Sequence, residues 1–287
     1  MISGRTVKAR LTVSIVTFAG DVARLKDSVE HLAVAVADIA HRILSSRICL
    51  IDNGPYSRAR SAELGDVLAG WQEAFEILAG HGNIGYGRGH NLAIARATSE
   101  YHLVLNPDVE LAPDSLANAL AFMDAHPACG LLAPATFEED GSLQFLCKRH
   151  PTVLDLLLRG FAPGWLRRRF QARLDRYEMR DAINERDVVW DPPIVSGCFM
   201  LFRTEVLRKL GGFDPRFFLY FEDFDLSLRT AKVARIAYVP SVRIVHHGGG
   251  AARKGLRHVR MFVTSAVKFF NKHGWRWVGR PMAADET

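Results

Sequence analysis

The stretch Tyr101-His102-Leu103-Val104-Leu105-Asn106-Pro107-Asp108 joins a short apolar run to a polar turn. Residues 101–105 are rich in branched and aromatic side chains and predict a buried β-strand. Asn-Pro-Asp favours a β-turn, because proline fixes φ while Asn and Asp side chains hydrogen-bond to the local backbone. The stretch therefore predicts a strand inside a sheet that presents polar side chains at its carboxyl end.

The same order of strand, polar turn and helix recurs before this stretch and continues after it. Strands are predicted at 11–18, 48–51 and 75–78, and helices at 21–44, 57–69 and 113–125. A further helix is opened by residues 83–91 and runs to about residue 97. Such alternation predicts an α/β fold with a mainly parallel sheet covered on both faces. Ligands of these sheets bind outside the carboxyl ends of the strands, where Asp52, residues 83–89 and residues 106–108 all fall.

The C-terminal half is less regular. Strands are predicted at 130–134 and 194–202 and a helix at 204–210 capped by Thr204, whereas 149–191 is interpreted as a basic, irregular segment. Residues 256–277 mix basic and aromatic side chains in an amphipathic pattern. Two interpretations of that pattern stay open: a helix in a membrane interface, or a helix that docks on the core and exposes a basic face.

Three carboxylates stand among apolar neighbours in Phe221-Glu222-Asp223-Phe224-Asp225-Leu226. Burial among such neighbours raises the pKa of an acid, which suits a general base. Two structural interpretations compete: acids stabilise the first turn of a helix, and Asp225 and Arg229 have the spacing of an i,i+4 ion pair.

A third polar point, His246-His247, follows another apolar run and is by itself typical of a strand end. The turn at 106–108 also needs no ligand to account for it. The acidic turn, the acidic cluster and the late histidine nevertheless occur in one chain. Together they predict a site for a divalent metal, a diphosphate and a base, and so an enzyme that acts on an activated, phosphorylated donor.

Composition places the chain among globular proteins. It has 287 residues, of which 48% are hydrophobic and 24% charged, enough for a large core. No apolar run reaches the length of a membrane span and residues 1–10 lack an apolar signal segment, so we expect a cytoplasmic protein. Four scattered cysteines predict reduced, mostly buried thiols. The net charge of +6 favours an anionic partner, and the lack of nucleic-acid-binding motifs argues against nucleic acid.

Glycines at 85, 87 and 89 permit a close approach of the backbone to a ligand. Their G-x-G-x-G spacing differs from the dinucleotide fingerprint G-x-G-x-x-G, and they follow the third predicted strand instead of the first. This difference argues against a nicotinamide cofactor.

Five segments together resemble family 2 glycosyltransferases with the GT-A fold, and most of all the bacterial rhamnosyltransferases. These segments are 12–18, 51–54, 83–91, 106–108 and 197–229, and the resemblance covers about residues 11–273. It implies one domain over 1–287, with a Rossmann-like, mainly parallel central sheet flanked by helices. The nucleotide-sugar-binding half would be 11–125, the acceptor-binding and catalytic half 126–250, and the basic-aromatic C-terminal helix 251–278. The implied reaction is inverting transfer from a nucleotide-diphospho-sugar, assisted by Mg²⁺ or Mn²⁺.

The resemblance assigns donor and base residues by position. The nucleotide and sugar of the donor would lie near Thr17, Asp52, Asn83, Gly85, Gly89, Asn91 and Asn106. Asp223 would take the proton from the acceptor hydroxyl, and Glu222 would keep the Asp223 side chain oriented. Asp225 would serve local structure, and Arg203 or the basic residues near Arg253 would add positive charge over the diphosphate.

The resemblance also implies metal ligands. Asp108 matches the last acid of the family's metal motif, and Asn106 stands where the first acid of that motif would be. This departure leaves fewer charged ligands for the metal. His246 would complete the site, with His247 as the alternative.

The favoured donor is dTDP-L-rhamnose, and a UDP-hexose or UDP-N-acetylhexosamine is the alternative. The acceptor would be a glycan or a polyprenyl-diphosphate-linked glycan of a surface polysaccharide such as O-antigen, reached by peripheral contact with the inner face of the inner membrane. A nucleotidyltransferase would carry a basic, glycine-rich loop after the first strand, which residues 17–21 do not supply. A non-catalytic module that binds nucleotide-sugar or glycan is the remaining alternative.

Overall fold

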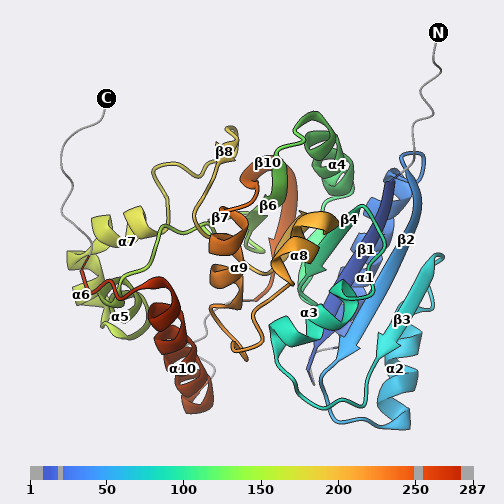
Figure 1. The fold of residues 1–287 in the computed structure, drawn as a ribbon, viewed down its shortest axis with the longest axis horizontal. Coiled ribbons are helices and arrows are strands. Elements are labelled where there is room, and N and C mark those ends of the chain that lie inside the picture. The colour runs from blue at the N-terminus through green and yellow to red at the C-terminus, as the bar shows by residue number, and fades with distance from the viewer. Residues whose placement is uncertain (1–8, 19–21, 249–254, 279–287) are drawn as a thin grey trace.

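The computed structural model describes residues 9–18, 22–248 and 255–278. Its strands form one sheet in the order β3-β2-β1-β4-β9-β6-β10-β5, with β7 paired to β6 and β8 to β10 (Figure 1). The strands are β1 Ala9–Thr17, β2 Ile43–Asp52, β3 Ala74–Leu78, β4 Tyr101–Leu105, β5 Val109–Leu111, β6 Cys129–Phe137, β7 Leu143–Gln144, β8 Val189–Trp190, β9 Phe199–Arg203 and β10 Arg235–His246. Strands β3, β2, β1 and β4 are parallel, whereas β9 runs antiparallel between β4 and β6. The predicted α/β fold with a central sheet is confirmed, and strands β1 to β4 are parallel as predicted, but the sheet as a whole is mixed because β9, β5, β7 and β8 pair antiparallel with their neighbours.

Helices cover both faces of this sheet. They are α1 Val22–Asp38, α2 Arg58–Leu68, α3 Tyr86–Ile94, α4 Ser115–Ala125, α5 Val153–Phe161, α6 Gly164–Arg169, α7 Gln171–Tyr177, α8 Thr204–Leu210, α9 Glu222–Thr230 and α10 Leu256–His273. Helices α1, α2 and α4 pack on one face, and α3, α8 and α9 pack on the other. Helices α5, α6 and α7 lie beside α10, away from the strands that open the chain (Figure 1).

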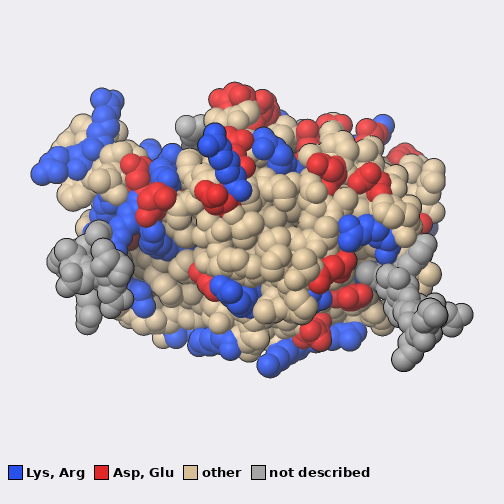
Figure 2. Space-filling view, turned by 90° about the horizontal axis from the view of Figure 1, so that it is seen from above, with Lys and Arg blue, Asp and Glu red and all other residues tan. Residues whose placement is uncertain are grey.

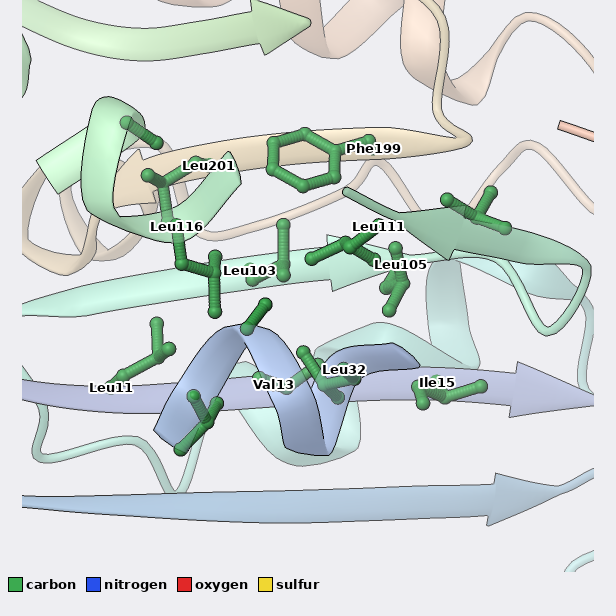
Figure 3. Close-up of a cluster of buried hydrophobic side chains, with 14 of the residues drawn as sticks. Leu11, Val13, Ile15, Leu32, Leu103, Leu105, Leu111, Leu116, Phe199 and Leu201 are labelled. Carbon is green, nitrogen blue, oxygen red and sulfur yellow. The ribbon is translucent and has the colours of Figure 1, made fainter. Parts of the chain in front are cut away.

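The core follows from the alternation of side chains along each strand. In β4, Leu103 and Leu105 face α1 and α4, whereas Val104 faces the opposite cluster. Figure 3 shows the first of these clusters, where Leu32 of α1 lies beside Val13 of β1. Because both faces are covered, the apolar runs of the central strands are buried on both sides. All four cysteines are free and buried, as predicted.

Several predicted boundaries differ from the structure. Helix α1 ends at Asp38 and β2 already begins at Ile43, so the helix is shorter and the strand longer than predicted. Strand β9 begins only at Phe199, and Ile194 instead forms an isolated bridge with Lys148. Thr204 is the first residue of α8 and provides no side-chain cap.

The prediction of an irregular segment at 149–191 is wrong, since three helices lie within it. Helix α5 begins with a capping box, in which Thr152 and Asp155 each bond the other's backbone N–H. An aspartate at the third helical position, in place of the more usual glutamate or glutamine, concealed this signal. The arginines at 167–169 then interrupt the apolar periodicity of the short helices that follow.

Helix α10 docks on the body of the protein. Phe269 and Phe270 are buried, whereas Val263 and Val267 are exposed. The core-docking interpretation therefore accounts for one apolar face of the helix. No helix in the described ranges is long and apolar enough to cross a membrane.

Candidate active site

The carboxyl ends of β1 and β2 bring two predicted donor contacts together. Thr17 and Asp52 are register partners, and both are buried. The Asp52 carboxylate accepts a hydrogen bond from the Gly54 amide and lies 3.5 Å from the Arg60 guanidinium. The following residue, Asn53, donates from its side-chain amide to the Gly85 carbonyl at 3.1 Å. The loop that carries the glycines is thereby tied to the end of β2.

The glycines of this loop approach protein groups closely. A Cβ at Gly85, where φ is +91°, would lie 2.4 Å from the Phe218 carbonyl oxygen. A Cβ at Gly89 would lie 2.8 Å from a methyl of Val16. Asn83 accepts from the Gly85 amide and fixes the turn before α3. Close packing against protein atoms therefore explains why Gly85 and Gly89 have no side chain. Their role beside a donor nucleotide stays a prediction.

Asn91 bonds to the protein with both ends of its amide. Its nitrogen donates to the Phe213 carbonyl at 2.7 Å, and its oxygen accepts from the Phe213 amide at 2.8 Å. These bonds join α3 to the loop before the acidic cluster. The structure therefore places Asn91 as a support of that loop, and the side chain would have to give up one of these bonds to contact a donor.

Tyr86 links the predicted site residues, and the sequence reasoning missed it. Its hydroxyl lies 2.9 Å from Asn106 Oδ1 and 2.7 Å from the Gly197 carbonyl. Burial raises the pKa of Tyr86 well above its usual range, and the nearby carboxylates of Glu222 and Asp223 raise it further. A tyrosine directly after the first glycine of the loop was visible in the sequence, but its partners come from distant segments.

Asn106, Asp108 and His246 converge at one edge of the sheet, because β5 pairs with β10. Asn106 Nδ2 lies 3.4 Å and Asp108 Oδ1 3.6 Å from His246 Nε2. Asp108 Oδ1 is buried without a hydrogen-bond partner among the described residues. A Cβ on Gly248 would lie 2.5 Å from Asp108 Oδ2 and 2.7 Å from His246 Nε2. The absent side chain of Gly248 therefore leaves room beside both groups.

These residues fit a divalent cation that is held partly by its substrate. No cluster of three or more His, Cys, Asp or Glu side chains suited to a metal occurs within 9–18, 22–248 and 255–278. The protein would thus supply Asp108 and His246, with Asn106 beside them. Mg²⁺ commonly binds through one or two carboxylates and completes its shell with substrate phosphates and water.

His247 points to other partners. Its two ring nitrogens lie 2.6 Å from Glu139 and 2.7 Å from Glu110. Although burial alone would lower the pKa of His247, the bonds to these two glutamates raise it above the usual range. A histidine held between two carboxylates is a poor candidate for the metal, so the geometry favours His246 over His247.

Glu222 and Asp223 open α9 and differ in their bonding. Asp223 accepts from the Gly197 amide at 3.0 Å and from the Phe224 amide at 2.9 Å. Glu222 is buried, and its Oε2 has no hydrogen-bond partner among the described residues. Burial raises the pKa of both acids, and the charge of Asp223 raises that of Glu222 further. Because backbone donors favour the charged form, Asp223 is the acid that keeps its negative charge.

Two residues before the acidic pair adopt the left-handed conformation without being glycine. Tyr220 has a φ of +70° and Phe221 a φ of +66°. Such backbone costs on the order of 1–3 kcal/mol per residue and persists only where its surroundings hold it. Phe221 packs against Phe224, Phe262 and Phe269, two of which belong to α10. Helix α10 thus holds the turn that aims Glu222 and Asp223.

Asp225 joins α9 to α10, as the prediction of a structural role required. It pairs with Arg229 at 2.7 Å, Lys272 at 2.5 Å and His273 at 2.8 Å. Burial alone would raise the pKa of Asp225, but its bonds to Lys272, His273 and Arg229 lower it. The expectation that burial raises the pKa of every acid in the cluster is therefore wrong for this one.

Arg203 lies at the other end of the sheet from the candidate site. It is the register partner of Tyr101, at the start of β4, and it donates to the carbonyls of Cys129 and Met123. The expectation that it adds charge over a diphosphate is wrong, because β9 runs antiparallel to β4. The basic residues near Arg253 lie outside the described residues.

Two sequence relatives are named as rhamnosyltransferases. The chain is 32% identical over 184 residues to N-acetylglucosaminyl-diphospho-decaprenol L-rhamnosyltransferase of Mycobacterium tuberculosis, a match that covers 58% of this chain and 56% of the relative. The chain thus matches about half the length of that relative. It is 24% identical over 208 residues to rhamnosyltransferase WbbL of Escherichia coli, which covers 69% of this chain and 72% of the relative.

Solved structures share the fold. A mannosyltransferase from Pyrobaculum calidifontis, in complex with GDP-Man and Mn²⁺, aligns with a TM-score of 0.60 and 18% identity, over 93% of this chain and 64% of its own. GalNAc-T7 with UDP, GalNAc and Mn²⁺ aligns with a TM-score of 0.61 and 14% identity, over 97% of this chain and 46% of its own. At these identities the likeness shows the GT-A fold. The sequence profile of Glycosyl transferase family 2 matches residues 15–211, more than half of the chain. The chain therefore belongs to glycosyl transferase family 2, and within that family it resembles the rhamnosyltransferases.

Proposed function

We propose that this protein is an inverting glycosyltransferase in which Asp223 is the general base. The observation that carries the proposal is a chain of contacts that runs from the proposed base, Asp223, to Asn106 beside the proposed metal ligands. Gly197 donates to Asp223 and accepts from Tyr86, whose hydroxyl also lies beside Asn106. A partly buried carboxylate with a raised pKa thus stands across one tyrosine from a set of groups suited to a diphosphate-bound cation.

The proposed donor is dTDP-L-rhamnose and the proposed acceptor a glycan on a polyprenyl diphosphate. Support comes from relatives named as rhamnosyltransferases, one of them for a diphospho-decaprenol substrate. Residues 11–125 would bind the nucleotide-sugar and residues 126–250 the acceptor, with the site where the two halves meet. The product would enter a surface polysaccharide, as in O-antigen synthesis, in keeping with a match to an O-antigen biosynthesis protein of Myxococcus xanthus.

Each group in the site has a proposed role. Asp223 takes the proton of the acceptor hydroxyl as that oxygen attacks the anomeric carbon, and the bond to the nucleoside diphosphate breaks on the opposite face. The neutral Glu222 maintains the geometry of Asp223, and Tyr86 positions Asn106. Asp108 and His246 would hold Mg²⁺ or Mn²⁺, which when bound neutralises the diphosphate and makes it a better leaving group.

A panel of nucleotides tests the proposed donor. We expect dTDP to raise the melting temperature more than UDP, GDP or CDP, and only when Mn²⁺ is present, because a ligand that binds the folded state alone stabilises it by mass action. Differential scanning fluorimetry measures the shift. A larger shift with UDP would keep the mechanism and change the donor. No shift with any nucleotide would support a non-catalytic module that binds glycan alone, or a donor site that forms only when the acceptor is bound.

The proposed acceptor places the enzyme at a membrane surface. Leu157 and Phe161 are exposed on α5, and Trp165 is exposed on α6, the helix that also carries the arginines at 167–169. Apolar side chains flanked by cationic ones suit an anionic interface. We propose that this surface makes peripheral contact with the inner face of the membrane.

Charge reversal tests this contact. Replacing Arg167, Arg168 and Arg169 with glutamate should weaken sedimentation with vesicles containing phosphatidylglycerol by more than about tenfold, since each basic residue near the surface contributes about 1 kcal/mol. The matched control reverses three exposed charges elsewhere, Arg58, Arg186 and Lys232. Equal loss in both variants would point to net charge, and unchanged binding would remove α6 from the membrane contact.

A further inference from the structure

A groove of about 980 Å³ lies between α5, α7 and the segment that follows α10. Its lining includes Arg149, Arg173, Arg176, Tyr177, Trp275 and Arg276, and we call it the arginine groove. In Figure 2, Lys and Arg gather at the end of the molecule that carries α5, α6 and α7. None of the predicted site residues lines this groove, so it is a separate feature that needs an explanation.

The charges in the arginine groove are not balanced by its own acids. Asp155, which pairs with Arg173 at 2.6 Å, is the one acid among its lining residues. Arg149 pairs at 2.7 Å with Asp181, which lies outside the lining. Within the part of the chain that the structure describes, neither Arg176 nor Arg276 forms an ion pair. Two guanidinium groups are therefore available to an anion that enters.

Tyr177 offers a further donor to such an anion. It lines the groove although only 3% of the residue is exposed. Its hydroxyl is buried and has no hydrogen-bond partner among the described residues. A buried hydroxyl without a partner is costly, and a phosphate oxygen would relieve that cost by accepting a hydrogen bond from it.

Both walls of the groove connect directly to the residues around the base. Tyr177 packs in one buried cluster with Phe221, which precedes Glu222, and with Ile194. Pro193 lines the groove and lies four residues before Gly197, which donates to Asp223. On the other wall, His273 bonds to Asp225 at 2.8 Å, two residues before Trp275. A ligand in the groove thus lies next to the structural supports of the catalytic pair.

The aromatic residues indicate what accompanies the anion. The rings of Trp275 and Trp277 stack at 5.1 Å, and the two residues are 43% and 63% exposed. Exposed indole faces bind the apolar faces of sugars and isoprenoid chains, while arginines match phosphate oxygens in a bidentate geometry. Arginines, a hydroxyl donor and indole rings in one groove fit a diphosphate that joins a sugar to a lipid.

We propose that the arginine groove binds the diphosphate of the lipid-linked acceptor, with Arg176, Arg276 and Tyr177 on its oxygens. The proposal rests on the proposed function, because it takes the acceptor to be a diphospho-lipid. Binding here would direct the sugar of the acceptor toward Asp223 and leave the donor site untouched. The groove would thereby select diphosphate-linked acceptors over free sugars.

Two acceptors that differ only in the diphosphate test the groove. The probes are a short-chain N-acetylglucosaminyl-diphospho-prenol and methyl N-acetylglucosaminide, used without vesicles. Replacing Arg176 and Arg276 with glutamate should lower kcat/KM for the diphospho-prenol by at least about tenfold, because each charge-assisted hydrogen bond to phosphate is strong. Transfer to the methyl glycoside and the KM of the donor should be unchanged. Arg186→Glu with Lys232→Glu is the charge-matched control.

Equal losses with both acceptors, or none with either, would overturn the proposal. Direct calorimetric titration with the diphospho-prenol keeps the test independent of turnover. If wild type transfers no sugar yet binds this probe, and the Arg176 and Arg276 variant does not, the proposed function fails and the groove stands. If wild type and variant bind the probe equally, the groove proposal fails whatever the reaction is. A Tyr177→Phe variant, which keeps the packing, should show a smaller loss confined to the diphospho-prenol.

Discussion

Replacing Asp223 with asparagine should abolish most turnover while leaving donor binding and folding intact. A positioned general base typically contributes about 10²–10⁴-fold, so we expect kcat to fall by about a thousandfold. Asparagine keeps an oxygen that can accept from the Gly197 amide, so the loop before β9 should stay in place. Transfer is measured by mass spectrometry of the product, and donor binding by the metal-dependent thermal shift.

The pH profile provides a second signature of this base. Burial raises the pKa of Asp223, so wild-type kcat/KM should fall as the pH drops through a range above that of an ordinary aspartate. Glu222→Gln should cost much less than Asp223→Asn, because the Glu222 carboxyl is already neutral near pH 7. An Asp223→Asn enzyme that still turned over at the wild-type rate would exclude Asp223 as the base.

Replacing Asp108 with alanine should remove the metal dependence of donor binding. Asp108 supplies the charged ligand of the pair with His246, and Asn106 cannot replace its charge. We expect the Mn²⁺-dependent thermal shift to disappear and activity to fall by at least about a hundredfold, since a metal contributes several kcal/mol to stabilising a developing charge.

The neighbouring acid Glu110 provides the matched control for Asp108. Its carboxylate bonds to His247 at 2.7 Å, so Glu110→Gln should keep the metal-dependent shift. Asp108→Asn should recover part of the shift, because the amide oxygen can still bind the cation. A metal-dependent shift that survived in Asp108→Ala would place the cation elsewhere.

Local chemistry in the sequence was sufficient for the framework. The apolar runs of β1 and β4 and the polar turns after them predicted an α/β fold whose first strands are parallel, because strand patterning and turn residues act over a few positions. The acids of α9 and the histidine at the end of β10 were likewise identified from the sequence as candidate site residues, each within its own segment. The helices α5, α6 and α7 were missed, since all three are short, the capping box of α5 uses an aspartate, and arginines interrupt the apolar spacing of the two helices that follow.

Outside α5, α6 and α7, the sequence by itself determined most of the elements and the polar residues that stand at their ends. Only the tertiary structure decided which of those residues meet, because β5 must pair with β10 to bring Asp108 beside His246. The tertiary structure also decided that Tyr86 links Asn106 to the Gly197 loop, which holds Asp223. Glu222 lacks the backbone donors that Asp223 has. A pKa depends on burial and on partners from distant segments, so the division of roles between two adjacent acids exists only once α9, α10 and the Gly197 loop have packed together.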